Sequence, residues 1–406
     1  MIRGVALLGI VIENVRFFAM STSRAMRGPW TLEGGLHDSI VAYLDLAFGH
    51  FKFLGLFTML FGFGLATQRA RLVRAGLGTT SFELRRIAWL AGMGLLHGLG
   101  LFFGDVLFVF AGVALLAMPI LGRSTRLRLG LGLGLVVLSG LLAARGPLQS
   151  WLDQSRTATP AVVMTEPSPP QDPAITPTDA VRGEAVVPMD TDGFDARFED
   201  WKSSIGYGVR FYGWYLLGLV LIGTVLHDLG FFETRHAVRR MQVSAACLIA
   251  GLALELARFL PVPWRGGDGF ALVAWSFLHP VSAATVVLGY AGLITTLVER
   301  RRFPIATAFG TLGRMSLSGY LLESILLAVI FRAWGLGWYD TLGNAAAVGV
   351  GISVFGVVMA AGLLWNRWFL LGPFEWCWRW FTYLQRPPIR RLDPPADGGS
   401  IDLSSR

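Results

Sequence analysis

Two ionisable residues, His97 and Asp105, lie within one long hydrophobic stretch of the sequence, residues 84–122. Imidazole and carboxylate groups exchange protons readily, so both residues are candidates for acid–base chemistry. An ionisable group at membrane depth costs roughly 2.5–3.5 kcal/mol on insertion scales, and each one therefore needs a partner or a purpose. Structural roles compete with chemistry here. His97 could hydrogen-bond a neighbouring helix, and Asp105, which follows Gly104, suits the N-cap of a helix.

Further polar residues interrupt the other hydrophobic stretches. Most fall near the stretch ends that we expect to face outward, so they could surround a water-filled cavity that opens on that side. These cavity candidates are Glu13, Asn14, Arg16, Asp45, His50, Lys52 and Arg210, together with Tyr320 and Glu323 near the middle of a later stretch.

Each of these residues also has a simpler interpretation. An acid and a base three residues apart on a helix can neutralise each other, which applies to two pairs, Glu13–Arg16 and Glu255–Arg258. Long polar side chains near a helix end can reach the interface, which applies to His50 and Lys52. Nothing in the sequence separates three other histidines from ordinary helix-end residues: His227, His236 and His279.

The composition is that of an integral membrane protein. The sequence is 53% hydrophobic and 15% charged, with a mean hydropathy of +0.55. A soluble globular chain carries about 25% charged residues. The 50 glycines fit a membrane protein, because glycine lets membrane helices approach closely. We therefore predict an all-α fold, a polytopic bundle of membrane-spanning helices.

About ten stretches approach the roughly 20 residues that a helix needs to cross a bilayer. We expect spans at 3–20, 41–68, 85–103, 105–122, 127–145, 207–229, 237–259, 271–298, 305–333 and 343–371. Arginines gather in alternate connections between these spans. The positive-inside rule assigns those connections, and with them both termini, to the cytoplasmic side.

The predicted spans form two five-helix halves, residues 1–145 and 206–371. Between them, the extracytoplasmic loop 146–205 is rich in proline and acidic residues, which disfavour a packed fold. We interpret this loop as a tether that ends in an interfacial helix, with docking of a substrate or partner as the alternative. The segment 372–406 starts with Gly-Pro and an aromatic-rich stretch. We expect that stretch to lie on the cytoplasmic interface ahead of a basic tail.

Several function classes lack support in the sequence. No hydrolase, zinc or nucleotide motif appears in a supporting context. Cys247 and Cys377 form neither a disulfide framework nor a metal set, and we predict no metal site. The net charge of +8 comes from arginines at helix ends rather than on one soluble face, so we expect no nucleic-acid partner. The expected partner is the lipid bilayer, and a homo-oligomer remains open.

Short motifs follow one another in order along nearly the whole chain. They are Arg3–Ile10 with Asn14, Phe51–Phe53, Leu60–Gly64, Leu96–Gly98, Gly104–Leu107, Tyr212–Trp214, Gly313–Leu322 and, most specific, Gly372–Trp376 continuing to Tyr383. Together they resemble the YeiB-like family of bacterial inner-membrane proteins, which carries a domain of unknown function (DUF418). The chain departs from the family pattern at Gly319, where an asparagine is usual, and ahead of Arg3, where an acidic residue is frequent. The resemblance implies a multi-pass protein of the bacterial cytoplasmic membrane.

More distantly, this family is similar to membrane acyltransferases of the heparan-glucosaminide acetyltransferase type. That likeness implies transfer of an acyl group from cytoplasmic acyl-CoA, such as acetyl-CoA, to an extracytoplasmic hydroxyl or amine. The acceptor would be a glycan, a lipid or a small molecule. Acyl-CoA would act as a co-substrate, and no tightly bound cofactor is expected.

Acyl transfer needs a general base near the outer side. Our hypothesis assigns this role to His97 or to His37, which lies where the acetyltransferase relatives carry a functional histidine. Asp105 or Glu13 would orient the imidazole. Three arginines would receive the CoA phosphates: Arg85, Arg86 and Arg314.

Two other classes of function fit the same residues. A transporter of a small solute would use the polar outer ends as its binding site. A non-catalytic membrane scaffold would use the aromatic C-terminal segment as its partner site.

Overall fold

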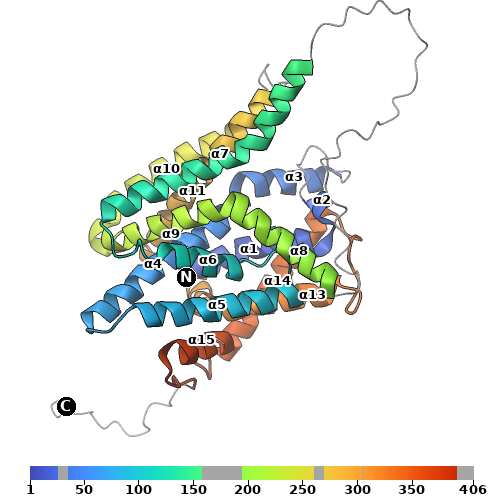
Figure 1. Cartoon of the computed structure of the whole chain (residues 1–406). Coiled ribbons are helices and arrows are strands. Elements are labelled where there is room, and N and C mark those ends of the chain that lie inside the picture. The colour runs from blue at the N-terminus through green and yellow to red at the C-terminus, as the bar shows by residue number, and fades with distance from the viewer. Residues whose placement is uncertain (26–34, 158–193, 260–268, 304, 391–406) are drawn as a thin grey trace, which may run out of the picture.

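The structure is a computed structural model, and it describes residues 1–25, 35–157, 194–259, 269–303 and 305–390. Within these ranges the chain is built from helices, and the only β pairing is an isolated bridge between Phe369 and Arg390. The predicted all-α polytopic bundle is therefore confirmed (Figure 1).

The described α-helices are α1 (Ile2–Ala19), α2 (Thr22–Ala25), α3 (Leu36–Leu44), α4 (Lys52–Arg74), α5 (Thr80–Gly100), α6 (Leu107–Ala117), α7 (Thr125–Thr157), α8 (Phe194–Tyr207), α9 (Gly213–Asp228), α10 (Ala237–Ala257), α11 (Gly269–Glu299), α12 (Ala306–Arg314), α13 (Ser316–Phe331), α14 (Asn344–Trp365) and α15 (Pro373–Tyr383). Two π-helical turns, η2 (Asp45–Gly49) and η3 (Gly208–Tyr212), precede α4 and α9, and a 3₁₀ turn, η4 (Thr234–His236), precedes α10.

Fewer helices meet the length and composition of a full membrane span than the ten predicted. Six described segments do so, and a seventh is added if α12 and α13, bent by 90° at their junction, count as one span. Helices α1 and α5 are not among these segments, and both carry charged side chains near their ends. With 11 residues, α6 is about 16 Å long, roughly half the thickness of the hydrocarbon core. The predicted span at 105–122 is thus only a partial crossing.

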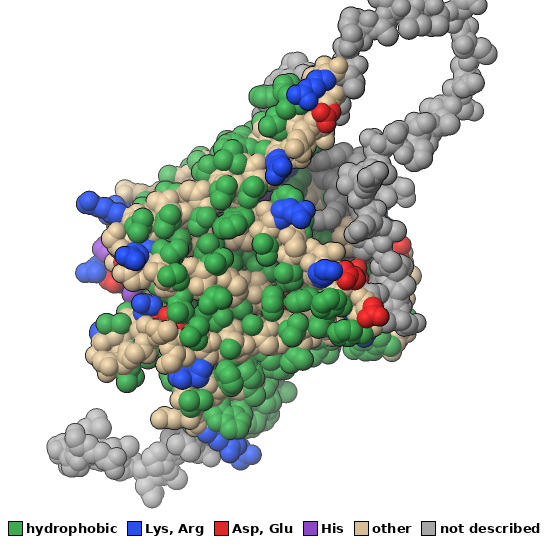
Figure 2. All heavy atoms as spheres, viewed as in Figure 1, with side chains coloured by type: hydrophobic (Ala, Val, Ile, Leu, Met, Phe, Trp, Pro, Cys, Tyr) green, Lys and Arg blue, Asp and Glu red, His purple; other side chains and the backbone are tan. Residues whose placement is uncertain are grey.

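Contacts between helix ends agree with the predicted alternation of the chain. On the side predicted to be cytoplasmic, ion pairs join neighbouring helix ends: Arg69–Glu83, Arg128–Asp228 and Arg240–Glu299. On the opposite side the contacts are Arg16–Asp45, Arg24–Asp340 and the hydrogen bond from Asp340 N–H to the Ala19 carbonyl. Figure 2 shows a group of basic side chains at the left end of the bundle, others spread over the rest of this face, and hydrophobic side chains across its middle.

The loop predicted at 146–205 is shorter than expected within the described chain. Helix α7 continues to Thr157, and α8 starts at Phe194. The segment predicted to be an interfacial helix forms α8, most of which belongs with η3 and α9 to one continuous candidate span, Arg197–Asp228. The proline-rich part of the loop and the basic tail after residue 390 lie outside the described residues.

The C-terminal segment forms a helix, α15, that holds the bend between α12 and α13. Glu375 of α15 accepts hydrogen bonds from the backbone N–H groups of Leu317 (2.7 Å) and Ser318 (3.1 Å), and from the Ser318 hydroxyl. These N–H groups belong to the first turn of α13 and lack helical partners, so the carboxylate stabilises that helix end. The aromatic segment is therefore more than an anchor for the interface.

Close backbone contact joins the two predicted halves where α4 crosses α9. A Cβ atom on Gly62 would lie 2.1 Å from the Val220 carbonyl oxygen, and one on Gly223 would lie 2.0 Å from the Met59 carbonyl oxygen. Only glycine allows this approach, which is the usual role of small residues between membrane helices.

We expect Gly223→Ala to lower the free energy of unfolding by about 1–3 kcal/mol, since the added methyl group must push α9 away from α4. Thermal unfolding of the detergent-purified protein measures this effect. Gly134→Ala is the matched control, because a Cβ there meets no atom within 4 Å. Equal unfolding temperatures for both variants would contradict the close contact.

Candidate functional site

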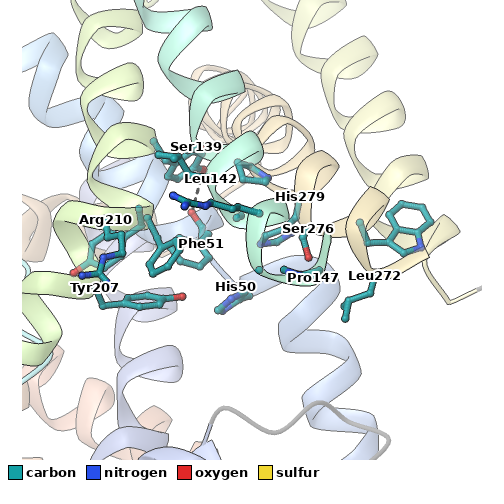
Figure 3. Close-up of a pocket in the computed structure, with 18 of the residues that line it drawn as sticks. His50, Phe51, Ser139, Leu142, Pro147, Tyr207, Arg210, Leu272, Ser276 and His279 are labelled. Carbon is teal, nitrogen blue, oxygen red and sulfur yellow. Dashed lines mark hydrogen bonds between the residues drawn. The ribbon is translucent and has the colours of Figure 1, made fainter. Parts of the chain in front are cut away.

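A cavity of about 780 Å³ lies between α7, η3 with the start of α9, α11, and the junction of η2 with α4. We call it the outer cavity, because these elements meet at the side predicted to be extracytoplasmic. Figure 3 shows Tyr207 and Arg210 on one side of it, with Ser276 and His279 across from them. Its volume is that of a typical small-molecule site. The sequence predicted such a cavity, but of its candidates only His50 and Arg210 line it.

The wall of the outer cavity is positively charged. Three arginines line it, Arg145, Arg210 and Arg258, and no aspartate or glutamate is among its described lining residues. The neutral polar groups include two histidines and the side chains of Tyr207 and Ser276. Guanidinium groups in this arrangement favour a ligand that carries a phosphate or carboxylate. Arg145 was not among the predicted cavity residues, because in the sequence it resembles an ordinary charged residue at a helix end.

Irregular helical geometry shapes the cavity. Both π-helical turns, η2 and η3, contribute to its wall, and such turns are frequent at functional sites. Helices α7 and α11 each contain an internal proline, Pro147 and Pro280, that also lines the cavity. A proline cannot donate to the carbonyl four residues earlier, so each one interrupts the regular ladder of its helix at this point.

Phe51, between η2 and α4, adopts the left-handed conformation with φ of 60°. This conformation costs roughly 1–2 kcal/mol in a residue other than glycine, and surrounding contacts must maintain it. The Phe51 N–H donates to Glu13 Oε2 at 3.4 Å, and its carbonyl accepts the Tyr215 hydroxyl at 3.3 Å. Glu13 therefore stabilises the backbone of Phe51, which forms part of the cavity wall.

Glu255, near the end of α10, is the centre of a buried polar network behind that wall. Its Oε1 lies 3.0 Å from His279 Nδ1 and accepts the Ser282 hydroxyl at 2.5 Å. Its Oε2 lies 3.5 Å from Lys52 Nζ and 3.4 Å from an Arg258 guanidinium nitrogen. The predicted Glu255–Arg258 pair exists, but it is one contact of four. The sequence missed His279 because its partner lies 24 residues away on another helix.

Lys52 is fully buried and does not reach the interface. Besides Glu255, its ammonium group contacts the carbonyls of Leu46 (3.0 Å) and His50 (3.3 Å). A buried ammonium must be paired and hydrogen-bonded, and these contacts meet that requirement. The interpretation of Lys52 as a snorkelling residue is wrong, because η2 folds over it.

Arg16 pairs with Asp45 of η2 at 2.6 Å rather than with Glu13, its neighbour on α1. The predicted neutralisation within α1 is thus replaced by an ion pair between elements. Asn14 lies half-buried on the same helix. The Arg16–Asp45 pair supports η2, and neither these two residues nor Asn14 lines the cavity.

His97 and Asp105 form a second imidazole–carboxylate pair, sealed inside the bundle. His97 Nδ1 lies 2.8 Å from Asp105 Oδ1, and both side chains are fully buried. Asp105 Oδ2 accepts the N–H of Phe108 at 2.7 Å, in the first turn of α6. Asp105 thus stabilises the first turn of α6, close to the N-cap role foreseen for it, whereas His97 hydrogen-bonds the connection after its own helix rather than a neighbouring helix. Asp105 lies at the junction of the predicted spans 85–103 and 105–122 but is buried, because the chain after α5 folds back into the bundle.

Tyr320 and Glu323 belong with His97 and not with the outer cavity. The rings of His97 and Tyr320 are 4.9 Å apart between centroids. Glu323 is buried, and neither of its carboxyl oxygens has a hydrogen-bond partner within the described part of the chain.

His37, the other predicted base, lies apart from both imidazole–carboxylate pairs. Its side chain is 74% exposed on α3, with Asp38 Oδ1 at 3.8 Å. Asp38 itself is engaged with the first turn of α14, where it accepts the N–H of Ala345 at 2.7 Å.

The three arginines predicted to bind CoA lie near α15 and the bend, in different settings. Arg86 is buried between the rings of Phe61 and Trp378, at 5.1 and 4.8 Å, and donates to Gln68. Arg85 donates to the Thr382 carbonyl at 2.9 Å. Arg314 is exposed at the end of α12. Arg314 is thus the most accessible of the three.

Comparison with known proteins finds one family model and several relatives that the chain resembles. Residues 226–385, which include Glu255 and His279, match the family model described as a protein of unknown function (DUF418). The chain is 28% identical over 396 residues to "Uncharacterized protein YeiB" of Escherichia coli (strain K12), covering 94% of each chain. The chain thus matches the DUF418 model in its C-terminal part and resembles YeiB over nearly its whole length. The predicted resemblance to this family is confirmed.

A second relative and the search of solved structures gave the following results. The chain is 24% identical over 411 residues to "Uncharacterized protein YxaH" of Bacillus subtilis (strain 168), covering 96% of this chain and 94% of the relative. No solved structure matches it.

We expect Glu255→Gln to lower the free energy of unfolding by about 3–5 kcal/mol, because it leaves the Lys52 ammonium buried without a counter-charge. The double variant Glu255→Gln/Lys52→Met should recover part of this loss, as it removes both buried charges. Thermal unfolding in detergent compares the wild type, the single variants Glu255→Gln and Lys52→Met, and the double variant. A double variant that loses the sum of the two single losses would contradict the pairing.

Proposed function

We propose that this protein is a membrane acyltransferase that moves an acyl group from cytoplasmic acyl-CoA to an acceptor in the outer cavity. The observation that carries the proposal is the His279–Glu255 pair at the cavity wall. A carboxylate on Nδ1 orients the imidazole and leaves Nε2 as the basic nitrogen. His279 Nε2 has no hydrogen-bond partner among the described residues.

In the proposed reaction, His279 Nε2 takes the proton from an acceptor hydroxyl or amine. The acceptor atom attacks the thioester carbonyl of acyl-CoA, a new C–O or C–N bond forms, and the C–S bond breaks. The thiolate of CoA leaves and takes the proton from the imidazolium. Glu255 stabilises the imidazolium formed in between, while Lys52 and Arg258 balance its charge.

His97 with Asp105 is the alternative base, with the same geometry. Its Nε2 also lacks a partner among the described residues, and the Nε2 atoms of both histidines are buried, but His279 lines the outer cavity whereas the fully buried side chain of His97 does not. A base must come within hydrogen-bond reach of the proton that it takes. This requirement favours His279 over His97 and over the exposed His37.

We expect His279→Gln to reduce acyl-CoA-dependent labelling of the acceptor by about 10²–10⁴-fold, the usual contribution of a general base. Labelling of membrane vesicles by radioactive acetyl-CoA measures the transfer. The same change at His97 and at His37 tests the two alternatives, and His227→Gln is the control at the opposite end of the bundle. Unchanged labelling in the His279 and His97 variants, with normal unfolding temperatures, would overturn the proposal.

We assign the adenosine phosphates of the acyl donor to the other side, near Arg314, from which the pantetheine arm would carry the thioester toward the outer cavity. Acetyl-CoA at about 100 times its Kd should stabilise the native state by roughly 2.7 kcal/mol. Thermal unfolding should show this shift with CoA but not with pantetheine, which lacks the adenosine phosphates, and Arg314→Gln should reduce it. A shift of equal size with pantetheine would contradict a phosphate site.

The bend between α12 and α13 favours a second candidate, a transporter. Secondary transporters place the ends of broken helices at the substrate site. In this chain, however, the N-terminus of α13 is already capped by Glu375. Solute uptake into proteoliposomes without any acyl-CoA would favour transport over acyl transfer.

A further inference from the structure

A second hollow adjoins the outer cavity on the side where α7 meets α8 and α9. It has a volume of about 670 Å³, and we call it the side groove. Its wall is formed by Leu138, Leu142, Gly206, Val209, Arg210 and Trp214. Except for Arg210, these residues offer only apolar surface and one indole ring.

The outer cavity and the side groove are continuous in their walls. Leu142 of α7 and Arg210 of η3 line both of them. A ligand that fills the two together would meet charge at one end and hydrocarbon at the other, with Arg210 at the boundary.

We propose that these two hollows together bind one anionic lipid, with its phosphate in the outer cavity and an acyl chain in the side groove. Arg145 and Arg210 supply guanidinium donors for the phosphate, Arg258 lies beside them in its pair with Glu255, and no carboxylate is among the described lining residues. Such charge-assisted contacts are the strong ones for phosphate.

The apolar wall explains why the ligand is a lipid and not a soluble phosphate. Leu138 and Val209 are exposed at the surface of the bundle, on helices apolar enough to span the membrane. An acyl chain can therefore enter the groove sideways from the bilayer while its headgroup stays at the outer interface. A soluble phosphate would leave this hydrocarbon surface uncovered.

This inference deepens the proposed function, because it names a lipid as the class of acceptor in the same cavity. Binding is measured without any acyl donor, so its failure is distinguishable from a failure of acyl transfer. Lipid binding without acyl transfer would leave the inference standing and remove the proposed reaction.

Three probes separate the headgroup from the chain. They are 1-oleoylglycerol 3-phosphate, glycerol 3-phosphate and 1-oleoylglycerol, each titrated into the full-length protein in a maltoside detergent. We expect 1-oleoylglycerol 3-phosphate to raise the unfolding temperature at concentrations at least about tenfold below those needed for glycerol 3-phosphate or 1-oleoylglycerol. The reason is that only this probe places both a phosphate in the outer cavity and an acyl chain in the side groove. If glycerol 3-phosphate were as potent as 1-oleoylglycerol 3-phosphate, the side groove would have no role in binding. If 1-oleoylglycerol were as potent, the arginines would have none.

Two matched pairs of variants locate the site. Arg210→Gln should weaken binding of 1-oleoylglycerol 3-phosphate about tenfold or more, whereas Arg126→Gln, an exposed arginine at the other end of α7, should not. Val209→Asn should weaken the same probe but not glycerol 3-phosphate, whereas Val238→Asn on the exposed surface of α10 should change neither. Unchanged affinity in both Arg210→Gln and Val209→Asn would place the lipid elsewhere and overturn the proposal.

Discussion

The buried carboxylate of Glu255 is the constraint on which the site depends. A charge at membrane depth is tolerated only when it is paired and hydrogen-bonded, and Glu255 meets this condition through Lys52, Arg258, His279 and Ser282. These partners come from α4, the end of α10, and α11. The single carboxylate therefore fixes three parts of the chain relative to one another, and it does so directly behind the wall of the outer cavity.

Polar groups inside this bundle fall into two separate sets. One set surrounds Glu255 and opens to the outer cavity, where arginines are in excess. The other set, around His97 and Asp105, is sealed between α5, α6 and α13. The same two functional groups, an imidazole and a carboxylate, are therefore suited to different roles in the two places. His279 lies where a ligand can arrive, while His97 and its carboxylate hold the turn that starts α6.

Much of the architecture followed from the sequence because it depends on composition and local order. Low charge and high hydropathy indicate an all-α membrane bundle, and the arginines in alternate connections predicted which helix ends lie on the same side. The pairing of His97 with Asp105 was also accessible, since both lie in one hairpin. The broken span at α12 and α13 was not, because it depends on Glu375, which lies about sixty residues further along the chain.

The sequence by itself determined the class of the protein, the alternation of its helices and the presence of polar groups near their outer ends. Only the tertiary structure decided which of those groups share a site. Arg145, Arg210, Arg258 and His279 come from four elements, and no spacing along the chain relates them. The physical reason is that hydrophobic patterning specifies which segments enter the membrane, whereas charge pairing between segments depends on how the helices are packed.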